Sequence, residues 1–244
     1  MEAPAAIEFR DVTYRLPDGR ALLEDLSLQV AGGSTVALLG KSGSGKTTLL
    51  RAVNRMNSIS SGEVLVRRRS VAEQDPIALR RSIGYVIQET GLFPHFNVER
   101  NVGLVLEIEG RPRAAIRERA RALLEMVGLS AEKFAERMPH ALSGGQRQRV
   151  GLARALAAGQ DILLMDEPFG ALDPLTRAEM QDVLRGLTTK ALGSGTRTTV
   201  LLVTHDLDEA LYLAERIVLI DEGRIAANLA AGEFLSSTVP AVRA

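Results

Sequence analysis

The sequence predicts an α/β fold in which a mainly parallel sheet forms the core and a helical segment is inserted into it. Short apolar runs of strand length recur along the chain, at 7–10, 22–30, 35–39, 83–87, 162–165, 200–204 and 217–220. Amphipathic runs of helix length lie among them, at 46–56, 113–127, 144–158, 174–190 and 207–214. Continuous apolar strands that alternate with helices are typical of a parallel sheet covered on both faces.

The composition indicates a globular protein with a substantial core. The chain has 244 residues, of which 45% are hydrophobic, and its formal net charge is zero. This charge balance argues against nucleic acid or anionic lipid as the main partner. The sequence contains no cysteine, so no disulfide framework and no thiolate metal site is expected. No apolar stretch approaches the roughly 20 residues of a membrane helix, and no secretory signal is seen, so a cytoplasmic protein is expected.

The long mixed-charge stretch 111–141 has apolar residues at helical spacing, at Ala120, Leu123, Leu124 and Val127. We interpret it as part of a helical subdomain at about 89–159, inserted into a core formed by about 1–88 and 160–244. The run Arg67 to Arg69 is interpreted as a solvated hairpin edge. The Gly-Ser-Gly stretch 193–195 is predicted to be a flexible connection.

Residues 40–47 match the phosphate-binding pattern G-x-x-x-x-G-K-[ST]. The matching residues are Gly40, Lys41, Ser42, Gly43, Ser44, Gly45, Lys46 and Thr47. A strand-like run precedes them, and a helix-like run with Thr48 in its first turn follows. The glycines let backbone N–H groups surround a polyphosphate at a helix N-terminus. We therefore expect Lys46 to reach the outer phosphates and Thr47 to ligate Mg²⁺; the alternative is a plain Gly/Ser-rich turn.

The apolar run 162–165 ends in Asp166, Glu167 and Pro168. In proteins with a phosphate loop, a carboxylate at the end of a neighbouring strand holds magnesium, directly or through water. This predicts Asp166 as a metal ligand. Glu167 points elsewhere as the strand ends and could accept a proton from an attacking water. The alternative is an ordinary acidic turn that caps a core strand.

The pentapeptide Leu142, Ser143, Gly144, Gly145 and Gln146 precedes an amphipathic segment that extends to Ala157. Ser143 suits the N-cap of that helix, and the two glycines expose backbone N–H groups at its start, where anions bind. A merely capped helix is the alternative. It leaves unexplained why this pentapeptide lies between a phosphate loop and an Asp-Glu strand end.

With these three motifs the chain resembles the ATP-binding subunits of ABC transporters, whose signature reads LSGGQ. The resemblance covers nearly the whole chain. It implies a P-loop NTPase core with a mainly parallel sheet, an N-terminal antiparallel β subdomain and an inserted helical subdomain. It also implies that ATP and Mg²⁺ bind at the phosphate loop, and that the enzyme is an ATPase coupled to transport across a membrane.

The same resemblance implies roles for further residues. Tyr14 matches the aromatic residue that stacks on adenine, although packing beside a strand is the alternative. Gln88 matches the glutamine that contacts magnesium and the attacking water. Asp173 matches the aspartate at the dimer interface, and His205 matches the histidine that senses the γ-phosphate; a satisfied core histidine is the alternative. Lys41 occupies a variable position of the loop and needs no role of its own.

The resemblance implies a head-to-tail dimer, or a pair with a related ATPase subunit, in which each ATP lies between two chains. One chain supplies the phosphate loop, and the other supplies Ser143, Gly144, Gly145 and Gln146. Glu167 then polarises a water, while His205 holds transition-state charge. Expected partners are transmembrane permease subunits and, through them, a substrate-binding protein; no nucleic acid is expected. The subunit is expected on the inner face of the cell membrane.

Several stretches resemble the importers of quaternary amines such as glycine betaine, choline and carnitine, namely 53–57, 61–63, 79–95, 168–177 and 204–210. The segment that begins at Gln88 is expected to form the surface on which the permease docks. Phe93 is either part of that surface or packed in the helical subdomain. Many betaine ATPases carry C-terminal CBS domains. None is expected here, because the sequence ends at Ala244.

Three other functions stay open. The chain could serve an importer of another small solute, such as an amino acid or a sulfonate. It could be an ABC ATPase of translation or DNA repair, although those proteins usually have two cassettes or a long coiled-coil insertion. It could be an inactive binding module, but the presence of Lys46, Asp166, Glu167 and His205 argues against this.

Overall fold

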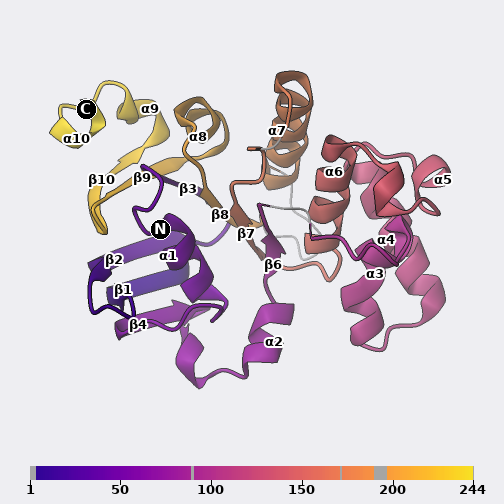
Figure 1. Ribbon diagram of the computed structural model, residues 1–244, viewed down its shortest axis with the longest axis horizontal. Coiled ribbons are helices and arrows are strands. Elements are labelled where there is room, and N and C mark those ends of the chain that lie inside the picture. The colour runs from indigo at the N-terminus through magenta and orange to yellow at the C-terminus, as the bar shows by residue number, and fades with distance from the viewer. Residues whose placement is uncertain (1–3, 89–90, 171, 190–196, 244) are drawn as a thin grey trace.

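The computed structural model describes residues 4–88, 91–170, 172–189 and 197–243, and its strands form two sheets (Figure 1). Among these residues, one sheet is antiparallel and has the order β2-β1-β4-β5: β1 (Ala5–Arg15), β2 (Ala21–Ala31), β4 (Ser61–Val66) and β5 (Arg69–Ser70). The other has the order β10-β9-β3-β8-β7-β6: β3 (Thr35–Leu39), β6 (Gly84–Val86), β7 (Ile162–Asp166), β8 (Thr199–Val203), β9 (Arg216–Asp221) and β10 (Arg224–Ala230).

The second sheet is parallel from β9 through β6, and only β10 pairs antiparallel. Every residue of β3, β7 and β8 is buried, as their continuous apolar sequences require. In β2, by contrast, buried and exposed residues alternate from Leu26 to Val30, because one face of the antiparallel sheet meets solvent. The predicted α/β fold with a mainly parallel sheet and an N-terminal antiparallel sheet is confirmed.

The helices are α1 (Lys46–Val53), α2 (Pro76–Arg81), α3 (Val98–Ile108), α4 (Arg113–Met126), α5 (Ala131–Phe134), α6 (Gly144–Ala155), α7 (Pro174–Thr189), α8 (Leu207–Leu213), α9 (Ala231–Phe234) and α10 (Pro240–Arg243), with 3-10 turns at Val71–Glu73 and Pro139–Ala141. Helices α3 to α6 lie between β6 and β7 in the sequence. In Figure 1 they gather on the side of the parallel sheet away from the antiparallel sheet.

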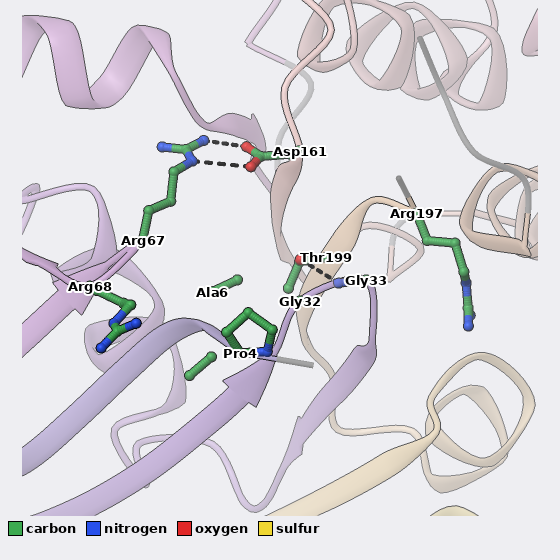
Figure 2. A pocket seen from close by; sticks show the side chains of 10 residues that line it. Pro4, Ala6, Gly32, Gly33, Arg67, Arg68, Asp161, Arg197 and Thr199 are labelled. Carbon is green, nitrogen blue, oxygen red and sulfur yellow. Dashed lines mark hydrogen bonds and ion pairs between the residues drawn. The ribbon is translucent and has the colours of Figure 1, made fainter. Parts of the chain in front are cut away.

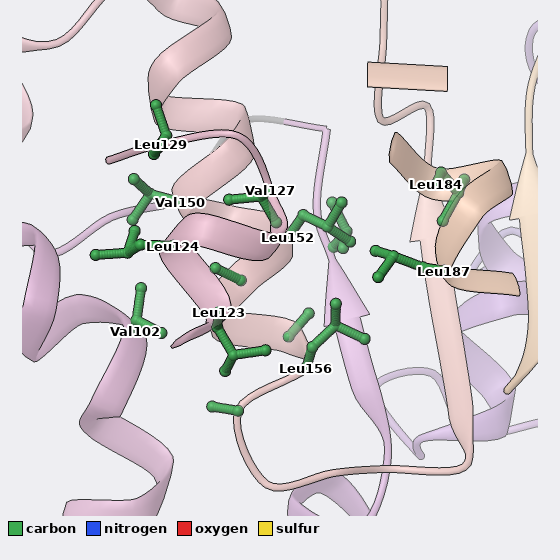
Figure 3. Packing of buried hydrophobic residues seen from close by; sticks show 14 of the residues in the cluster. Val102, Leu123, Leu124, Val127, Leu129, Val150, Leu152, Leu156, Leu184 and Leu187 are labelled. Atoms are coloured by element: carbon green, nitrogen blue, oxygen red, sulfur yellow. The ribbon is translucent and has the colours of Figure 1, made fainter. Parts of the chain in front are cut away.

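The two faces of the parallel sheet belong to different hydrophobic clusters. Leu163 and Leu202 pack with α3, α4, α6 and α7, while Leu164 and Leu201 pack with α1 and the antiparallel sheet. This division follows from the period of two in a strand. Figure 3 shows part of the first cluster, where Leu152 of α6 lies between Leu124 of α4 on one side and Leu187 of α7 on the other. The inserted helices are thereby anchored to the sheet that carries the site.

The apolar patterns did not predict β4, β5, β10, α2, α3, α5, α9 and α10. Helix α3 contains Val-Gly-Leu-Val-Leu at 102–106, which resembles a strand because β-branched residues and glycine are poor helix formers. Gly103 has a packing reason, since a Cβ there would lie 2.4 Å from Cγ2 of Ile116 on α4. The predicted flexible connection at 193–195 lies outside the described residues. Within the described ranges, no helix combines the length and apolarity needed to cross a membrane.

Candidate functional site

The predicted site segments follow the carboxyl ends of four neighbouring parallel strands. The phosphate loop follows β3, Gln88 follows β6, Asp166 ends β7 and His205 follows β8. The sheet order β3-β8-β7-β6, with Asp166 in register with Val203, brings all four to one edge. Ligands bind at this edge in open parallel sheets.

Two glycines allow the phosphate loop to pass close to its neighbours. Gly40 has φ +152°, and a Cβ there would lie 2.2 Å from the carbonyl oxygen of Ile220. Gly45 has φ +99°, and a Cβ there would lie 2.5 Å from Cδ2 of Leu23. Both positions therefore require glycine on steric grounds. Next to them the Ser44 hydroxyl is buried and has no hydrogen-bond partner among the described residues, so a polar group remains available inside the loop.

Lys46 closes the loop from inside. It is only 4% exposed, and its Nζ donates hydrogen bonds to the carbonyl oxygens of Gly40 (2.7 Å) and Lys41 (2.8 Å). Burial lowers the pKa of Lys46, while the negative charges of Glu167 and Asp166 act in the opposite direction. The ammonium group thus lies between the loop and the two carboxylates.

Asp166 is the most heavily hydrogen-bonded side chain of the edge. The hydroxyl of Thr47 donates to Oδ1 at 2.7 Å, while Arg51 Nη2 (3.2 Å) and the hydroxyl of Tyr85 (3.3 Å) approach Oδ2. A hydroxyl and a carboxylate side by side are hard oxygen donors, which suit Mg²⁺ bound together with phosphates. No group of three His, Cys, Asp or Glu side chains could hold a metal ion within the described part of the chain. The donor set that fits Mg²⁺ is therefore Thr47 and Asp166.

Glu167 has the backbone conformation of a left-handed residue, with φ 45°. This is uncommon outside glycine, and such strain is concentrated at functional sites. Its Oε2 accepts a hydrogen bond from Gln88 Nε2 at 3.2 Å and lies 3.5 Å from His205 Nδ1. The His205 side chain is 62% exposed, so it is not a satisfied core histidine. The predicted metal ligand Gln88 is thus hydrogen-bonded to Glu167, whereas the other two predicted ligands, Thr47 and Asp166, are hydrogen-bonded to each other.

Ser143 caps α6 as its sequence predicts. The Ser143 Oγ accepts from the backbone N–H of Gln146 (3.2 Å), and Oε1 of Gln146 accepts from the N–H of Ser143 (3.0 Å), which makes a capping box. Ser143 and Gly144 are exposed, whereas Gly145 is buried. Figure 1 shows α6 and α1 on opposite sides of the middle strands of the parallel sheet. One chain therefore keeps this helix start apart from its own phosphate loop.

The start of α7 lies against the start of α6. A Cβ on Gly145 would be 2.2 Å from Cγ2 of Thr176, so glycine permits this close approach. The N–H of Thr176 donates to Oδ1 of Asp173 (3.1 Å), and hydrogen bonds from Thr176 lower the pKa of the exposed Asp173. Asp173 and the 142–146 segment consequently share one side of the chain.

The remaining predicted residues lie around the loop. Tyr14 is half-buried on β1 in register with Leu23, the residue that touches Gly45, and it packs against the cluster beneath α1. Lys41 and Ser42 are exposed and Thr48 is half-buried. Tyr14 therefore packs partly against the core, as the alternative expects. Its partner Leu23 on the neighbouring strand β2 lies next to Gly45 of the loop.

The motifs did not point to three further residues. Arg51 and Tyr85 hold Asp166 and also each other, at 3.1 Å between Arg51 Nε and the Tyr85 hydroxyl. Gln148, which is 4% exposed, donates from Nε2 to the carbonyl oxygen of Pro168 and so links α6 to the turn after Glu167. Tyr85 lies in β6, opposite Leu164 of β7. The contacts of all three residues join segments far apart in the sequence.

A pocket of about 570 Å³ lies at the opposite, amino-terminal edge of the parallel sheet (Figure 2), and no predicted site residue lines it. Arg67 there forms an ion pair with Asp161, with Nε 3.1 Å from Oδ2, and lowers the pKa of that carboxyl. Arg67 and Arg68 form the turn between β4 and β5, with φ 50° and 64°. The predicted hairpin edge is therefore present, and Arg67, Arg68 and Arg69 are all exposed, as predicted. Figure 2 shows the Arg197 side chain directed away from Arg67 and Asp161. Its Nε donates a hydrogen bond to the carbonyl oxygen of Thr188 at 3.0 Å.

Among proteins of known sequence, the ATP-binding protein OpuCA of Bacillus subtilis, named for glycine betaine, carnitine and choline transport, is 45% identical over 90% of this chain and 56% of its own length. YehX of Escherichia coli, named as the ATP-binding protein of a glycine betaine uptake system, is 45% identical over 90% of this chain and 69% of its own. This chain therefore spans little more than half of OpuCA.

Among solved structures, the dimeric ATP-binding cassette MJ0796 bound to ADP and Pi superposes with a TM-score of 0.81. It is 33% identical, and the match covers 92% of this chain and 98% of that one. Residues 23–170 match the family model described as ABC transporter, a range that contains the loop, the 142–146 segment and the Asp166-Glu167 strand end. The chain belongs to the ABC transporter family.

Proposed function

We propose that this chain is the ATP-hydrolysing subunit of an ABC importer. The observation that carries the proposal is the convergence of Gln88 and His205 on one oxygen of Glu167, beside the buried Lys46. A general base needs hydrogen-bonding neighbours that fix its direction, and phosphoryl transfer needs positioned positive charge. Both requirements meet at one edge of the sheet.

In the proposed reaction, Glu167 Oε2 accepts a proton from a water whose oxygen forms a bond to the γ-phosphorus. The bond between that phosphorus and the bridging oxygen of ADP breaks in the same displacement. Lys46 and the loop N–H groups hold the outer phosphates, and His205 stabilises the charge that builds on them. Thr47 and Asp166 would hold Mg²⁺, with Gln88 turning to it from Glu167; when bound, the ion neutralises phosphate charge.

Replacing Glu167 by Gln tests this assignment, because the amide keeps the shape and removes the base. Turnover is expected to fall by about two to four decades, the usual contribution of a general base, while ATP binding survives. Glu222 offers a matched control, since it is an exposed glutamate that also has a left-handed backbone, with φ 46°. Near-normal turnover in Glu167→Gln, with turnover of Glu222→Gln unchanged, would contradict the role of Glu167 as general base.

We further propose that two ATPase chains share each nucleotide. Ser143 and Gly144 are exposed at a helix N-terminus that its own loop does not reach, and Asp173 lies on the same side. A second chain that approaches head-to-tail would place its phosphate loop against this helix start, where backbone N–H groups suit phosphate. The dimeric state of the related cassette MJ0796 supports this arrangement. Tyr14 would then lie beside the adenine.

The permease is proposed to dock on the inserted helices, which with their flanks form a helical subdomain at about 89–159 on a core at about 1–88 and 160–244. Phe93 is 40% exposed, so it is not core packing. Asn101, which is fully buried, fixes the Phe93 backbone in both directions, with Phe93 N–H to Oδ1 at 2.8 Å and Nδ2 to Phe93 O at 3.1 Å. Beside it, His95 and Phe96 line a groove of about 810 Å³ between α3 and α4 that could accept a short helix. The chain would thereby lie on the inner face of the membrane.

Phe93→Ala tests this surface. The variant is expected to lose transport and permease binding while the isolated subunit keeps its ATPase activity and its melting temperature within a few degrees. Leu235→Ala is the control, because Leu235 is a 72% exposed apolar side chain at another site. A buried phenylalanine would instead cost about 3–5 kcal/mol on truncation, so a large drop in melting temperature would contradict the docking role.

For the cargo we propose a quaternary amine such as glycine betaine, choline or carnitine, delivered through a substrate-binding protein. The proposal rests on the likeness to OpuCA and YehX, since the residues described above meet nucleotide and partner chains rather than cargo. Uptake of labelled betaine, choline and carnitine should fall in cells that lack this subunit. Unchanged uptake of all three, with lost uptake of an amino acid or a sulfonate, would overturn the cargo and leave the ATPase proposal intact.

A further inference from the structure

Glu209 of α8 is a buried carboxyl group that the proposed hydrolysis does not use. It is 5% exposed, and its Oε1 has no hydrogen-bond partner within the described part of the chain. The Thr204 side chain lines the same small cavity as Glu209 and lowers the pKa of this carboxyl group. A carboxyl group is expensive to bury, so a position that retains one next to the site calls for a physical reason.

Hydrogen bonds link Thr204 and Asp206, the residues on either side of His205, and link Asp206 to Glu209. The Thr204 Oγ1 accepts from the N–H of Asp206 at 3.0 Å, and Oδ1 of Asp206 accepts from the N–H of Glu209 at 3.1 Å. The Thr204 side chain also acts on the Glu209 carboxyl group, whose pKa it lowers. His205 is the residue between Thr204 and Asp206, and its side chain is 62% exposed, with Nδ1 3.5 Å from Oε2 of Glu167.

Arg177 extends this network to the start of α7. Its Nη1 lies 3.3 Å from Oδ2 of Asp206, and its Nη2 lies 3.5 Å from the carbonyl oxygen of Leu172, the residue before Asp173. The Nε of Arg177 is buried and, like Glu209 Oε1, is without a partner among the described residues. Both residues line one cavity of about 10 Å³, which is close to the volume that one water requires. The other residues of its wall are Glu167, Gly170, Thr204, His205 and Asp206.

We propose that Glu209 is a positioning residue that, together with Arg177, holds the 204–206 turn so that His205 faces Glu167, and that it ties this turn to the segment before Asp173. A water in the small cavity would bridge Glu209 Oε1 and Arg177 Nε. The inference rests on the proposed function, because it requires Glu167 and His205 to act in hydrolysis. It adds a link between the proposed dimer contact at Asp173 and the residue beside the base.

The charge state of Glu209 fits this role. Burial raises the pKa of Glu209 to about 8; the charges of Asp206 and Glu167 act in the same direction, whereas the Thr204 hydrogen bond and the Arg177 charge oppose them. The neutral carboxyl group can donate a hydrogen bond at pH 7. It also adds no third negative charge beside Asp206 and Glu167. Ionisation above about pH 8 would change both properties.

Three variants test the inference through the kcat and KM of ATP hydrolysis from pH 6.5 to 9.5, with melting temperatures measured alongside. Glu209→Gln keeps a neutral hydrogen-bonding group, and its kcat should stay within about twofold of wild type at pH 7. The kcat of wild type should decline above pH 8 as Glu209 ionises, and the kcat of Glu209→Gln should lack this decline. Glu209→Leu keeps the volume without polar atoms, and its kcat should fall at least about tenfold with the KM for ATP within about threefold. Asp208→Asn, at an exposed acid of the same helix, should behave as wild type.

A Glu209→Leu protein with wild-type kcat would overturn the inference, and so would a Glu209→Gln protein with the wild-type pH profile. Where Glu209→Leu does not fold, the profile of Glu209→Gln decides. The Glu167→Gln variant separates this result from the proposed function. Its loss of turnover beside an unaffected Glu209→Leu rejects only the positioning role, whereas normal turnover in Glu167→Gln rejects hydrolysis by this base.

Discussion

The carboxyl edge of the parallel sheet and the start of α6 both present groups that suit phosphate, but they differ in completeness. At the edge, Lys46, Thr47 and Glu167 each have a partner in the same chain, at 2.7 to 3.5 Å. At the start of α6, Ser143 and Gly144 face solvent, and the serine oxygen serves only to cap its own helix. The edge is preorganised by one chain, whereas the helix start offers donors that need a ligand from outside.

This comparison predicts that the nucleotide affinity of the monomer is set by the edge. Lys46→Ala removes an ammonium that is hydrogen-bonded inside the loop, and at about 1.5–3 kcal/mol for each charged hydrogen bond, ATP binding should weaken by about 100-fold or more. Lys41→Ala, at an exposed lysine of the same loop, should change affinity less than about twofold. Titration with a fluorescent ATP analogue measures both. Equal effects of the two lysines would mean that the edge is not preorganised.

The start of α6 should control association instead. Glu167→Gln with ATP should double the molecular mass in light scattering, because bound ATP is not turned over. Adding Ser143→Arg places a long cationic side chain at the exposed cap, so the double variant should stay monomeric. Its ATP affinity should remain within about threefold of the single variant. A double variant that still dimerises would show that this helix start does not meet the second chain.

A smaller effect is expected where the start of α6 packs against the start of α7. Gly145→Ala pushes a methyl group against Thr176, and overpacking of this kind costs about 1–3 kcal/mol of unfolding free energy. Gly144→Ala is the matched control, since nothing lies within 4 Å of its added Cβ. Thr176→Ser removes the clashing methyl and should restore most of the stability of Gly145→Ala. Chemical denaturation of wild type, Gly145→Ala, Thr176→Ser and the double variant gives the coupling free energy between the two positions. Additive losses of unfolding free energy would exclude the contact.

The strands of the core could be predicted because they are buried on both faces. The run 35–39 was predicted at the bounds that β3 has. The run 162–165 ended one residue before β7 does, and the run 200–204 was displaced by one residue from β8. Helix α3 was missed because its Val-Gly-Leu-Val-Leu sequence favours a strand locally, and only the contact of Gly103 with Ile116 makes helix the better solution. Local preference decided the first case and tertiary packing the second.

The candidate site divides in the same way. The loop, the Asp166-Glu167 pair and the Ser143 cap are local patterns, so spacing and flanking sequence were enough to find them. The Arg51-Tyr85-Asp166 contacts and the Arg177-Asp206-Glu209 network join residues that only the fold brings together. A single sequence carries no signal for such pairs. The roles of the individual site residues stay predictions until the variants above are measured.

The position of β3 in its sheet has a consequence for biosynthesis. This strand lies near the N-terminus of the chain, yet both of its neighbours, β8 and β9, come from residues 199–221. While the chain is being made, the strand that leads into the phosphate loop has neither neighbour until residues 199–221 have left the ribosome. The antiparallel sheet needs only residues 5–70, so it can form early, because pairing of nearby segments closes shorter loops. The all-buried strand Thr35–Leu39 is then exposed until β8 and β9 have been made, the situation in which nascent chains depend on chaperones.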